Sequence, residues 1–357
     1  MEGNVMLKLI EALTNAFGPS GFEEDVVDAV IAQKLPFELN VDAMNNVYLS
    51  LRSNTGDRPV IMLDAHLDEV GFMVQSIQSN GLISIATLGG WVPTNVPAHT
   101  VLIKTQSGKF VKGIVASKPP HFMSEKEKAA PLEIERLLID VGVTCRDEVV
   151  TLYGIQVGDP IAPDVNFSYD EQTGVLFGKA FDNRLGCVSV IETMKRLSAL
   201  GDLGVDVVGA LASQEEVGTR GAYVTSQVVK PDYAIVFEGS PADDFSSDRL
   251  SSQCAMKAGT QIRHLDASYV SHRGFINFAK GLADSSAIKY QSAVRRKGGT
   301  NAGRIHVQGK AVPVLVLGVP SRYVHTHYNF SALEDVESTV ALAVEVITHI
   351  CDFPNRF

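Results

Sequence analysis

Four apolar runs of this chain, each long enough to form a buried strand, end abruptly in acidic or histidine side chains. Helical patterns lie between these runs, and strands that alternate with helices predict a mostly parallel sheet flanked by helices. In an open α/β sheet, ligands bind outside the carboxyl ends of the strands. We therefore expect the side chains at the ends of these runs to meet at one edge of the sheet. In chain order they are His66 with Asp68, Glu215 with Glu216, Glu238, and His325 with His327.

The pattern of residues between about Gln75 and Asp164 differs from that of the rest of the chain. Short strand-like pieces separated by Gly, Pro and polar turns predominate here, with one short helical candidate at 131–142. We interpret this part as a small β-rich domain, residues 72–164, inserted into a discontinuous catalytic α/β domain, residues 1–71 and 165–357. The strand-like pieces cover residues 82–88, 100–105, 109–116 and 148–154.

Two helix starts carry the spacing of a capping box, in which a hydroxyl side chain and an acid three residues later satisfy backbone N–H groups. Ser20 with Glu23 predicts the start of the second helix. Ser331 with Glu334 predicts the start of the last helix.

The adjacent acids Glu215 and Glu216 need an explanation, because two neighbouring carboxylates at the end of an apolar strand repel each other and are costly to desolvate. The pair becomes tolerable if divalent cations supply positive charge, one acid binding an ion while its neighbour transfers a proton. Imidazole with carboxylate is the ligand mix of zinc, cobalt or manganese. A further acid, Asp182, starts a helix and by itself is typical of an N-cap. Asp68 by itself fits a structural role, such as holding His66 or capping a turn, as well as it fits a role in the chemistry of a site.

The overall charge excludes some partners. The formal net charge is −10, with 41 Asp and Glu against 31 Lys and Arg, so neither nucleic acid nor an anionic membrane is an expected partner. The short basic segment 295–299 is interpreted as a solvated loop. The four cysteines form no C-x-x-C pair, and no apolar run approaches the ~20 residues of a membrane span. The amphipathic N-terminus lacks the apolar segment of a signal peptide, and we expect a cytoplasmic protein.

Six stretches, in a fixed order along the chain, carry more specific motifs: GPSGFEEDV (18–26), AHLDEVGFMV (65–74), KPPHF (118–122), GKAFDNRLG (178–186), SQEEVGTRGA (213–222) and VPSRYVHT (319–326). Together they resemble the tetrahedral-aminopeptidase and glutamyl-aminopeptidase family of dinuclear metallopeptidases. The resemblance implies an α/β metallopeptidase fold of the phosphorylase/hydrolase type. It also implies a metal-dependent aminopeptidase that removes N-terminal residues from short peptides.

The resemblance further implies a site with two divalent metal ions per subunit, zinc or cobalt in the first place and manganese as a third option. Asp182 would bridge the two ions. His66 and Glu238 would complete the ligands of one ion, and Glu216 and His325 would complete those of the other.

The same resemblance implies the catalytic roles. A hydroxide activated between the two ions would attack the first peptide bond, and Glu215 would act as general base and then return the proton to the leaving amine. Asp68 would orient the His66 ring. A free α-amine would be held near the acidic cluster, so the substrates would be peptides with a free N-terminus.

Two positions depart from the family pattern. Glu238 stands where the family usually has Asp, and Asn301 lies in a segment where Asp is usual. Neither change removes a metal-binding position, because Glu also binds these metals. The metal geometry and the substrate preference are the properties that the two changes would affect.

The inserted domain would, again by resemblance, assemble the subunits into large hollow dodecamers. Two other interpretations stay open at this point. One is a metal-binding relative without catalytic activity, to which the changes at Glu238 and Asn301 would point. The other is a glycoside hydrolase that uses Glu215 with a second acid, although neighbouring residues on an extended strand point in opposite directions and the histidines would then have no role.

Overall fold

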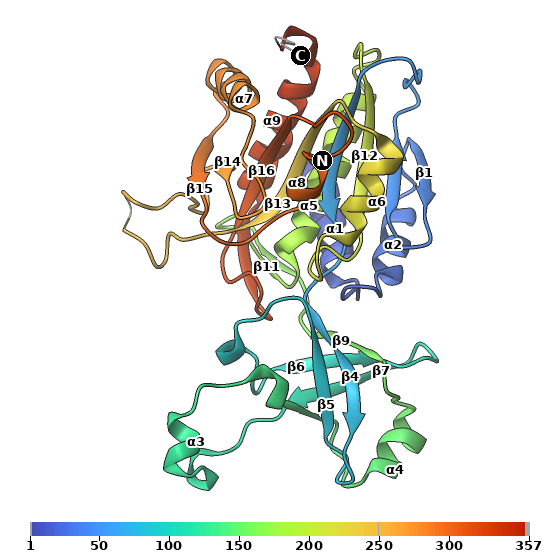
Figure 1. Cartoon of the computed structure of the whole chain (residues 1–357), viewed down its shortest axis with the longest axis vertical. Helices are drawn as coiled ribbons and strands as arrows, with labels where there is room; N and C mark the ends of the chain where they lie inside the picture. Colours follow the sequence, from blue (N-terminus) through green and yellow to red (C-terminus); the bar gives the residue numbers. More distant parts are fainter. Residues whose placement is uncertain (1, 249, 354–357) are drawn as a thin grey trace.

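The computed structural model describes residues 2–248 and 250–353, and its upper part in Figure 1 is built on an eight-stranded sheet. The four central strands β12, β3, β13 and β16 run parallel to one another, whereas β1, β2 and β14 join the sheet through antiparallel pairs. The strand order is β1 (Glu38–Val41), β2 (Val47–Ser50), β12 (Asp206–Ala212), β3 (Val60–His66), β13 (Tyr233–Pro241), β16 (Val314–Ser321), β14 (Thr260–Leu265) and β15 (Tyr290–Val294).

Helices cover both faces of this sheet because its central strands are apolar on both sides. In β3, for example, Ile61 and Leu63 pack into the core beneath one layer of helices, and Met62 packs into the core on the opposite face. The first layer contains α1 (Glu2–Asn15), α5 (Phe181–Ser198), α7 (Arg273–Ser285) and α9 (Leu333–Thr348), with α2 (Glu24–Ile31) beside α1. The opposite layer contains α6 (Arg220–Val229) and the short α8 (Ala302–Ile305).

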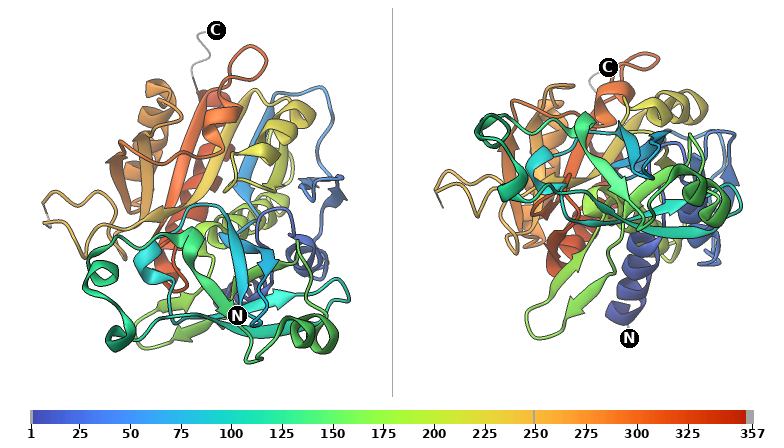
Figure 2. Two further views of the ribbon diagram at one scale, coloured as in Figure 1. Left: turned by 60° about the horizontal axis from the view of Figure 1, so that its bottom comes forward. Right: turned by 90° about the horizontal axis from the view of Figure 1, so that it is seen from below.

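The lower part of the molecule in Figure 1 is a closed antiparallel barrel with its own apolar core. The view from below in Figure 2 shows this barrel in front of the central sheet. The predicted fold class, a mostly parallel α/β sheet with an inserted β-rich part, is confirmed. The barrel strands in order are β4 (Gly71–Ile77), β5 (Ile83–Leu88), β8 (Leu138–Asp140), β7 (Phe110–Val115), β6 (Thr100–Lys104) and β9 (Pro160–Pro163).

Smaller elements connect these two parts. A three-stranded sheet of β10 (Ser168–Asp170), β11 (Val175–Gly178) and β17 (Asn329–Ala332) leads the chain back from the barrel to the large sheet. None of the helices in the described ranges is long and apolar enough to cross a membrane. The short helical elements are α3 (Glu125–Ala129), α4 (Arg146–Glu148), η1 (Pro93–Asn95), η2 (Pro120–Phe122), η3 (Ile134–Arg136), η4 (Val149–Tyr153) and η5 (Ile350–Asp352).

Two local predictions in the inserted part are wrong. The helical candidate at 131–142 forms only the turn η3 followed by the strand β8, because Ile134, Leu137 and Ile139 all point into the barrel core. The strand-like piece at 148–154 is helical, at α4 and η4. Barrel packing, rather than local pattern, decides the conformation of both segments.

Both predicted capping boxes are also wrong, since their side chains have partners elsewhere in the fold. The Ser20 hydroxyl donates to Asp68 Oδ2 at 2.5 Å, and Glu23 Oε1 accepts from the Gln214 backbone N–H at 3.1 Å. The N-cap of α9 is Ala332, and the Ser331 hydroxyl instead donates to the Pro320 carbonyl at 2.8 Å. The first pair therefore supports the loops at the ends of β3 and β12.

Candidate active site

The ends of the parallel strands bring the candidate residues to the edge of the sheet that faces the barrel. His66 is the last residue of β3, and Glu238 lies near the end of β13. Glu215 and Glu216 follow β12, and His325 follows β16. Parallel strands end at the same edge of a sheet, so residues far apart in the sequence converge there.

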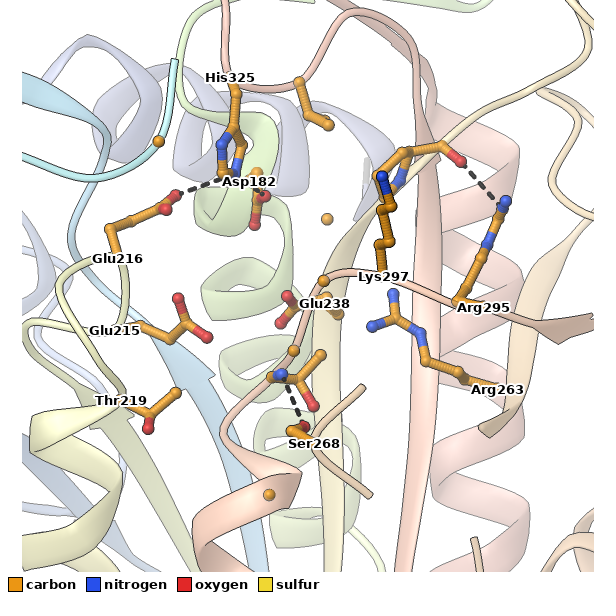
Figure 3. Close-up of a pocket in the computed structure, with 18 of the residues that line it drawn as sticks. Asp182, Glu215, Glu216, Thr219, Glu238, Arg263, Ser268, Arg295, Lys297 and His325 are labelled. Atoms are coloured by element: carbon orange, nitrogen blue, oxygen red, sulfur yellow. Dashed lines mark hydrogen bonds and ion pairs between the residues drawn. The ribbon is translucent and has the colours of Figure 1, made fainter. Parts of the chain in front are cut away.

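Asp182 lies at the centre of this cluster, in the first turn of α5. Its Oδ1 is 3.2 Å from His66 Nε2, and its Oδ2 is 3.4 Å from His325 Nε2. The same His325 nitrogen is 3.5 Å from Glu216 Oε1, and a dashed line marks this contact in Figure 3. His66, Asp182 and Glu216 can present ligand atoms that all lie within 4.8 Å of one another. The two oxygens of one carboxylate thus face two different histidines.

The backbone around Asp182 is shaped for this position. Asp182 and Asn183 have non-helical dihedral angles although they lie within α5, and the peptide bond between them is cis. A Cβ atom on Gly239 would lie 2.5 Å from Asp182 Cα, so only glycine allows β13 to approach this closely. The N-cap of α5 is Ala180, so the interpretation of Asp182 as a helix cap is wrong.

Asp68 connects the His66 ring to the loop that carries the two glutamates. His66 Nδ1 is 3.1 Å from the Asp68 carbonyl and 3.3 Å from its Oδ1. The Asp68 carboxylate also accepts from the backbone N–H groups of Glu215 at 2.9 Å and Glu216 at 3.1 Å. Burial opposes ionisation of Asp68, but the hydrogen bonds from His66, Ser20 and the Glu215 backbone, together with the charge of His66, outweigh it and lower the Asp68 pKa.

Glu215 and Glu216 lie beyond the strand rather than on it. β12 ends at Ala212, and Gln214 has a φ of 51°, so the chain turns before it reaches the two acids. Both side chains consequently line the same cavity. The expectation that these neighbours point in opposite directions is therefore wrong. The Glu215 carboxylate makes no hydrogen bond to any part of the chain that the structure describes, which leaves it free for a bound molecule.

The electrostatics of the cluster favour a cation. Burial raises the pKa of Glu215 to about 7 and holds the pKa values of Glu216 and Glu238 well above their usual range. Burial disfavours the charged imidazole of His325, yet the neighbouring Glu216 and Asp182 carboxylates raise its pKa to about 10. The buried acids are thus under-compensated by positive charge within the protein. A donor set of imidazole nitrogens and carboxylate oxygens fits divalent zinc, cobalt or manganese.

Glu238 takes part through a different contact. Its Oε2 accepts from Asn183 Nδ2 at 3.2 Å, and the same amide donates to the Phe237 carbonyl at 2.8 Å. Glu238 and Asp182 line the same cavity. The structure therefore gathers the other six predicted site residues around Asp182. Glu238 joins them through the shared cavity and the Asn183 contact rather than through a direct ion pair.

A cavity of about 980 Å³ opens onto the cluster. Acidic side chains form one wall, and Gly90, from the loop after the barrel strand β5, closes the side next to His325. Basic side chains form another wall, with Arg263 and Lys297 visible across the cavity from Glu216 in Figure 3. The segment 295–299, expected to be a solvated loop, is a loop that lines this cavity.

Some residues around the site gave no separate signal in the sequence. The fully buried Arg184 donates to the Leu67 carbonyl at 2.6 Å and the Leu13 carbonyl at 2.5 Å, joining α1 to the end of β3. It lies within the FDNR motif, which could have pointed to it. His327, in contrast, stacks on His99 with ring centres 4.5 Å apart and lies outside the group of ligand atoms.

Known proteins match this chain almost from end to end. The M42 glutamyl aminopeptidase family profile matches residues 45–342. The chain is 30% identical over 343 residues to a glutamyl aminopeptidase of Lactococcus lactis subsp. cremoris, covering 96% of this chain and 95% of that protein. A TET aminopeptidase from a marine-sediment Thaumarchaeota archaeon superposes with a TM-score of 0.93 at 34% identity, covering 98% of both chains. The TET1 peptidase of Pyrococcus horikoshii gives a TM-score of 0.84 at 26% identity, covering 96% of this chain and 99% of that one.

These matches confirm the family resemblance that the motifs predict. They also confirm that the protein is a hydrolase of peptide bonds. Because the profile spans most of the chain and the structural matches span nearly all of it, this protein belongs to the M42 glutamyl aminopeptidase family of metallopeptidases.

Proposed function

We propose that this protein is an aminopeptidase that uses two divalent metal ions per subunit to remove N-terminal residues from short peptides. The observation that carries the proposal is Asp182, whose two carboxylate oxygens face His66 on one side and His325 on the other. Asp182 would bind both ions. His66 and Glu238 would complete the ligands of one ion, and Glu216 and His325 would complete those of the other. When bound, such ions lower the pKa of water and polarise a carbonyl group.

The chain's own residues would move the proton. Glu215 lines the cavity without a hydrogen-bonding partner for its carboxylate among residues 2–248 and 250–353. Its carboxylate would take a proton from the attacking water and return it to the leaving amine. Asp68 would keep the His66 ring oriented through the contact to Nδ1.

The acidic wall would select a free N-terminus. An α-ammonium group would be attracted to the carboxylates that line the cavity, whereas an acetylated N-terminus carries no charge to be attracted. The reaction would accordingly begin at the first peptide bond and spare internal ones. The identity of the metal, zinc or cobalt with manganese as a third option, stays a prediction. The cytoplasmic location stays a prediction as well.

Removal and return of metal tests this function. We expect chelation to abolish release of the first residue from short peptides, and zinc, cobalt or manganese to restore it. Release should occur from peptides with a free N-terminus and be absent from their acetylated counterparts. About two bound ions per chain without turnover of any peptide would contradict the proposal and favour a non-catalytic metal-binding relative.

We further propose that residues 72–164 form an oligomerisation domain of a homo-oligomer. The barrel exposes apolar side chains on its surface, among them Phe110, Ile114 and Leu152. A related TET1 peptidase can assemble into a tetrahedron or a large octahedral shell. Burial of such a surface between subunits would stabilise a large assembly.

Light scattering tests the assembly. We expect a particle of twelve chains of 38.5 kDa each, the dodecamer implied by the family resemblance. Replacing the exposed Ile114 with Lys should shift the mass towards smaller species, and replacing the exposed Val307 on the catalytic domain should not. A wild-type mass close to that of one chain would contradict the proposal.

A further inference from the structure

The loop at 213–216, which follows β12 and carries Glu215 and Glu216, has all four of its backbone N–H groups bound by side-chain oxygens. Buried N–H groups outside a helix or sheet ladder need such partners. The three side chains that accept them come from three separate segments of the chain, and each is fully buried. The conformation of the loop therefore depends on these side chains. The contacts are Ser213 N to Asn46 Oδ1 at 2.8 Å, Gln214 N to Glu23 Oε1 at 3.1 Å, Glu215 N to Asp68 Oδ1 at 2.9 Å and Glu216 N to Asp68 Oδ2 at 3.1 Å.

The carbonyl groups of the same loop are also bound. The Gln214 carbonyl accepts from the Arg220 backbone N–H at 3.1 Å, and the Glu215 carbonyl accepts from the Thr219 N–H at 2.7 Å. These contacts fold the loop back onto the start of α6. The loop is thus held from two sides, and Glu215 and Glu216 both project from it into the cavity (Figure 3).

Gln214 is the strained point of the loop. Its φ of 51° lies in the left-handed region, which residues other than glycine rarely adopt. Such a conformation persists only where the surrounding contacts enforce it. Glu23 supplies the side-chain contact to the Gln214 N–H group, immediately before Glu215 in the chain. Glu23 therefore acts at the position that turns the chain and directs the next side chain into the cavity.

The Glu23 carboxylate is itself held in place. Its Oε1 also accepts from the Gly21 N–H at 2.8 Å, and its Oε2 lies 3.5 Å from Asn45 Nδ2. The turn before α2 that ends in Glu23 also carries Ser20, whose hydroxyl donates to Asp68 at 2.5 Å. The same turn thus supports the loop twice, directly through Glu23 and indirectly through Asp68.

We propose that Glu23 is a positioning residue that sets the direction of the Glu215 carboxylate by holding the backbone of Gln214. Glu23 is buried behind the loop and acts through its backbone. Glu216 is held separately, because its N–H group donates to Asp68. Loss of the Glu23 contact should therefore slow proton transfer before it affects metal binding. The inference rests on the proposed role of Glu215 as general base.

Replacing Glu23 with Met tests this role, because Met has a similar length but offers no strong acceptor for the Gln214 N–H group. In the metal-loaded variant we expect kcat to fall by roughly tenfold to a hundredfold, as for a misplaced catalytic group, with KM and metal content close to those of the wild type. Glu23→Asp keeps the charge but shortens the side chain by one methylene group. It should lose kcat as well, and it provides the test if the Met variant does not fold.

Two further variants define what Glu23 supplies. Glu23→Gln keeps the oxygen that accepts from Gln214 and should retain kcat within a few-fold of the wild type. Glu24, exposed one residue further along, accepts from the same Asn45 amide at 3.2 Å. Glu24→Met is the matched control and should leave kcat unchanged. Loss of kcat in Glu23→Gln as large as in Glu23→Met would contradict the proposal, because the acceptor oxygen would then not be the feature that matters.

A double-mutant comparison separates positioning from a general loss of structure. If Glu23 acts through Glu215, adding Glu23→Met or Glu23→Asp to Glu215→Gln should change the residual kcat by less than about twofold. Equal factors in the wild-type and Glu215→Gln backgrounds would overturn the proposal, because Glu23 would then act independently of Glu215. If Glu215→Gln still lowers kcat in that case, the general-base assignment stands without this role for Glu23.

Hydrogen exchange of the loop gives a measurement that needs no turnover. In Glu23→Met and Glu23→Asp, the amide of Gln214 and its neighbours in the loop should exchange faster than in the wild type, whereas the amides of β3 should keep their protection. Glu23→Gln should protect the loop as the wild type does. Unchanged protection of the loop in both Glu23→Met and Glu23→Asp would overturn the proposal, whether or not the protein cleaves peptides.

Discussion

Replacing Glu215 with Gln is expected to lower kcat by roughly 10²–10⁴-fold and to leave metal binding intact. The substitution removes the group that accepts the proton but preserves the size of the side chain. It also preserves the backbone N–H that donates to Asp68 at 2.9 Å, so the loop after β12 should keep its conformation. Steady-state kinetics together with metal analysis of the purified variant measures both properties.

The neighbouring Glu216 provides the contrast, since Glu216→Gln should lose metal as well as activity. Glu11, exposed on α1, is the matched control, and Glu11→Gln should behave as the wild type. Substantial turnover by a metal-loaded Glu215→Gln variant would disprove the assignment of the general base.

Replacing Asp182 with Asn should have the second large effect, the loss of bound metal together with activity. An amide offers one acceptor oxygen in place of two, so it cannot face both His66 and His325 with negative charge. We expect metal affinity to fall by more than the roughly 10–100-fold that loss of an outer hydrogen-bonding partner costs. Metal titration by calorimetry gives the affinity and the number of ions per chain.

Asp28→Asn, at an exposed position of α2, is the matched control and should bind metal as the wild type does. Thermal unfolding of both variants without metal would show whether the fold is preserved. Two ions bound with unchanged affinity by Asp182→Asn would refute the bridging role.

The sequence was most informative where packing follows a simple period. The runs that became β3, β12, β13 and β16 are buried on both faces, so their apolar character alone predicts strands in a parallel sheet. The sequence misled where a distant partner competes with a local one. Ser20 has the spacing of a helix cap, but Asp68 is the partner that it contacts in the folded chain.

For the site, the motifs pointed to residues at strand ends because chain direction places them together. They gave no indication of Arg263, which stands within the mixed sequence GTQIRHL rather than at the end of an apolar run and reaches the cavity through the pairing of β14 with β16. The turn at Gln214 was equally hidden, because a positive φ at a non-glycine residue leaves little trace in the sequence. These features depend on which residues lie side by side in the folded chain, and the residue types along the sequence do not reveal that.

The position of Gly90 makes the inserted barrel part of the wall around the site. Gly90 belongs to the segment that follows β5, yet it lines the cavity beside His325, and the nearby Trp91 Nε1 donates to the Gly71 carbonyl at 3.1 Å. The inserted barrel therefore supplies part of the enclosure around the reacting groups. A shortened chain that joined residue 71 directly to residue 165 would lose that side and leave an open trench. A substitution in the segment after β5 can for this reason alter the enclosure around His325 as directly as one in the segment after β16.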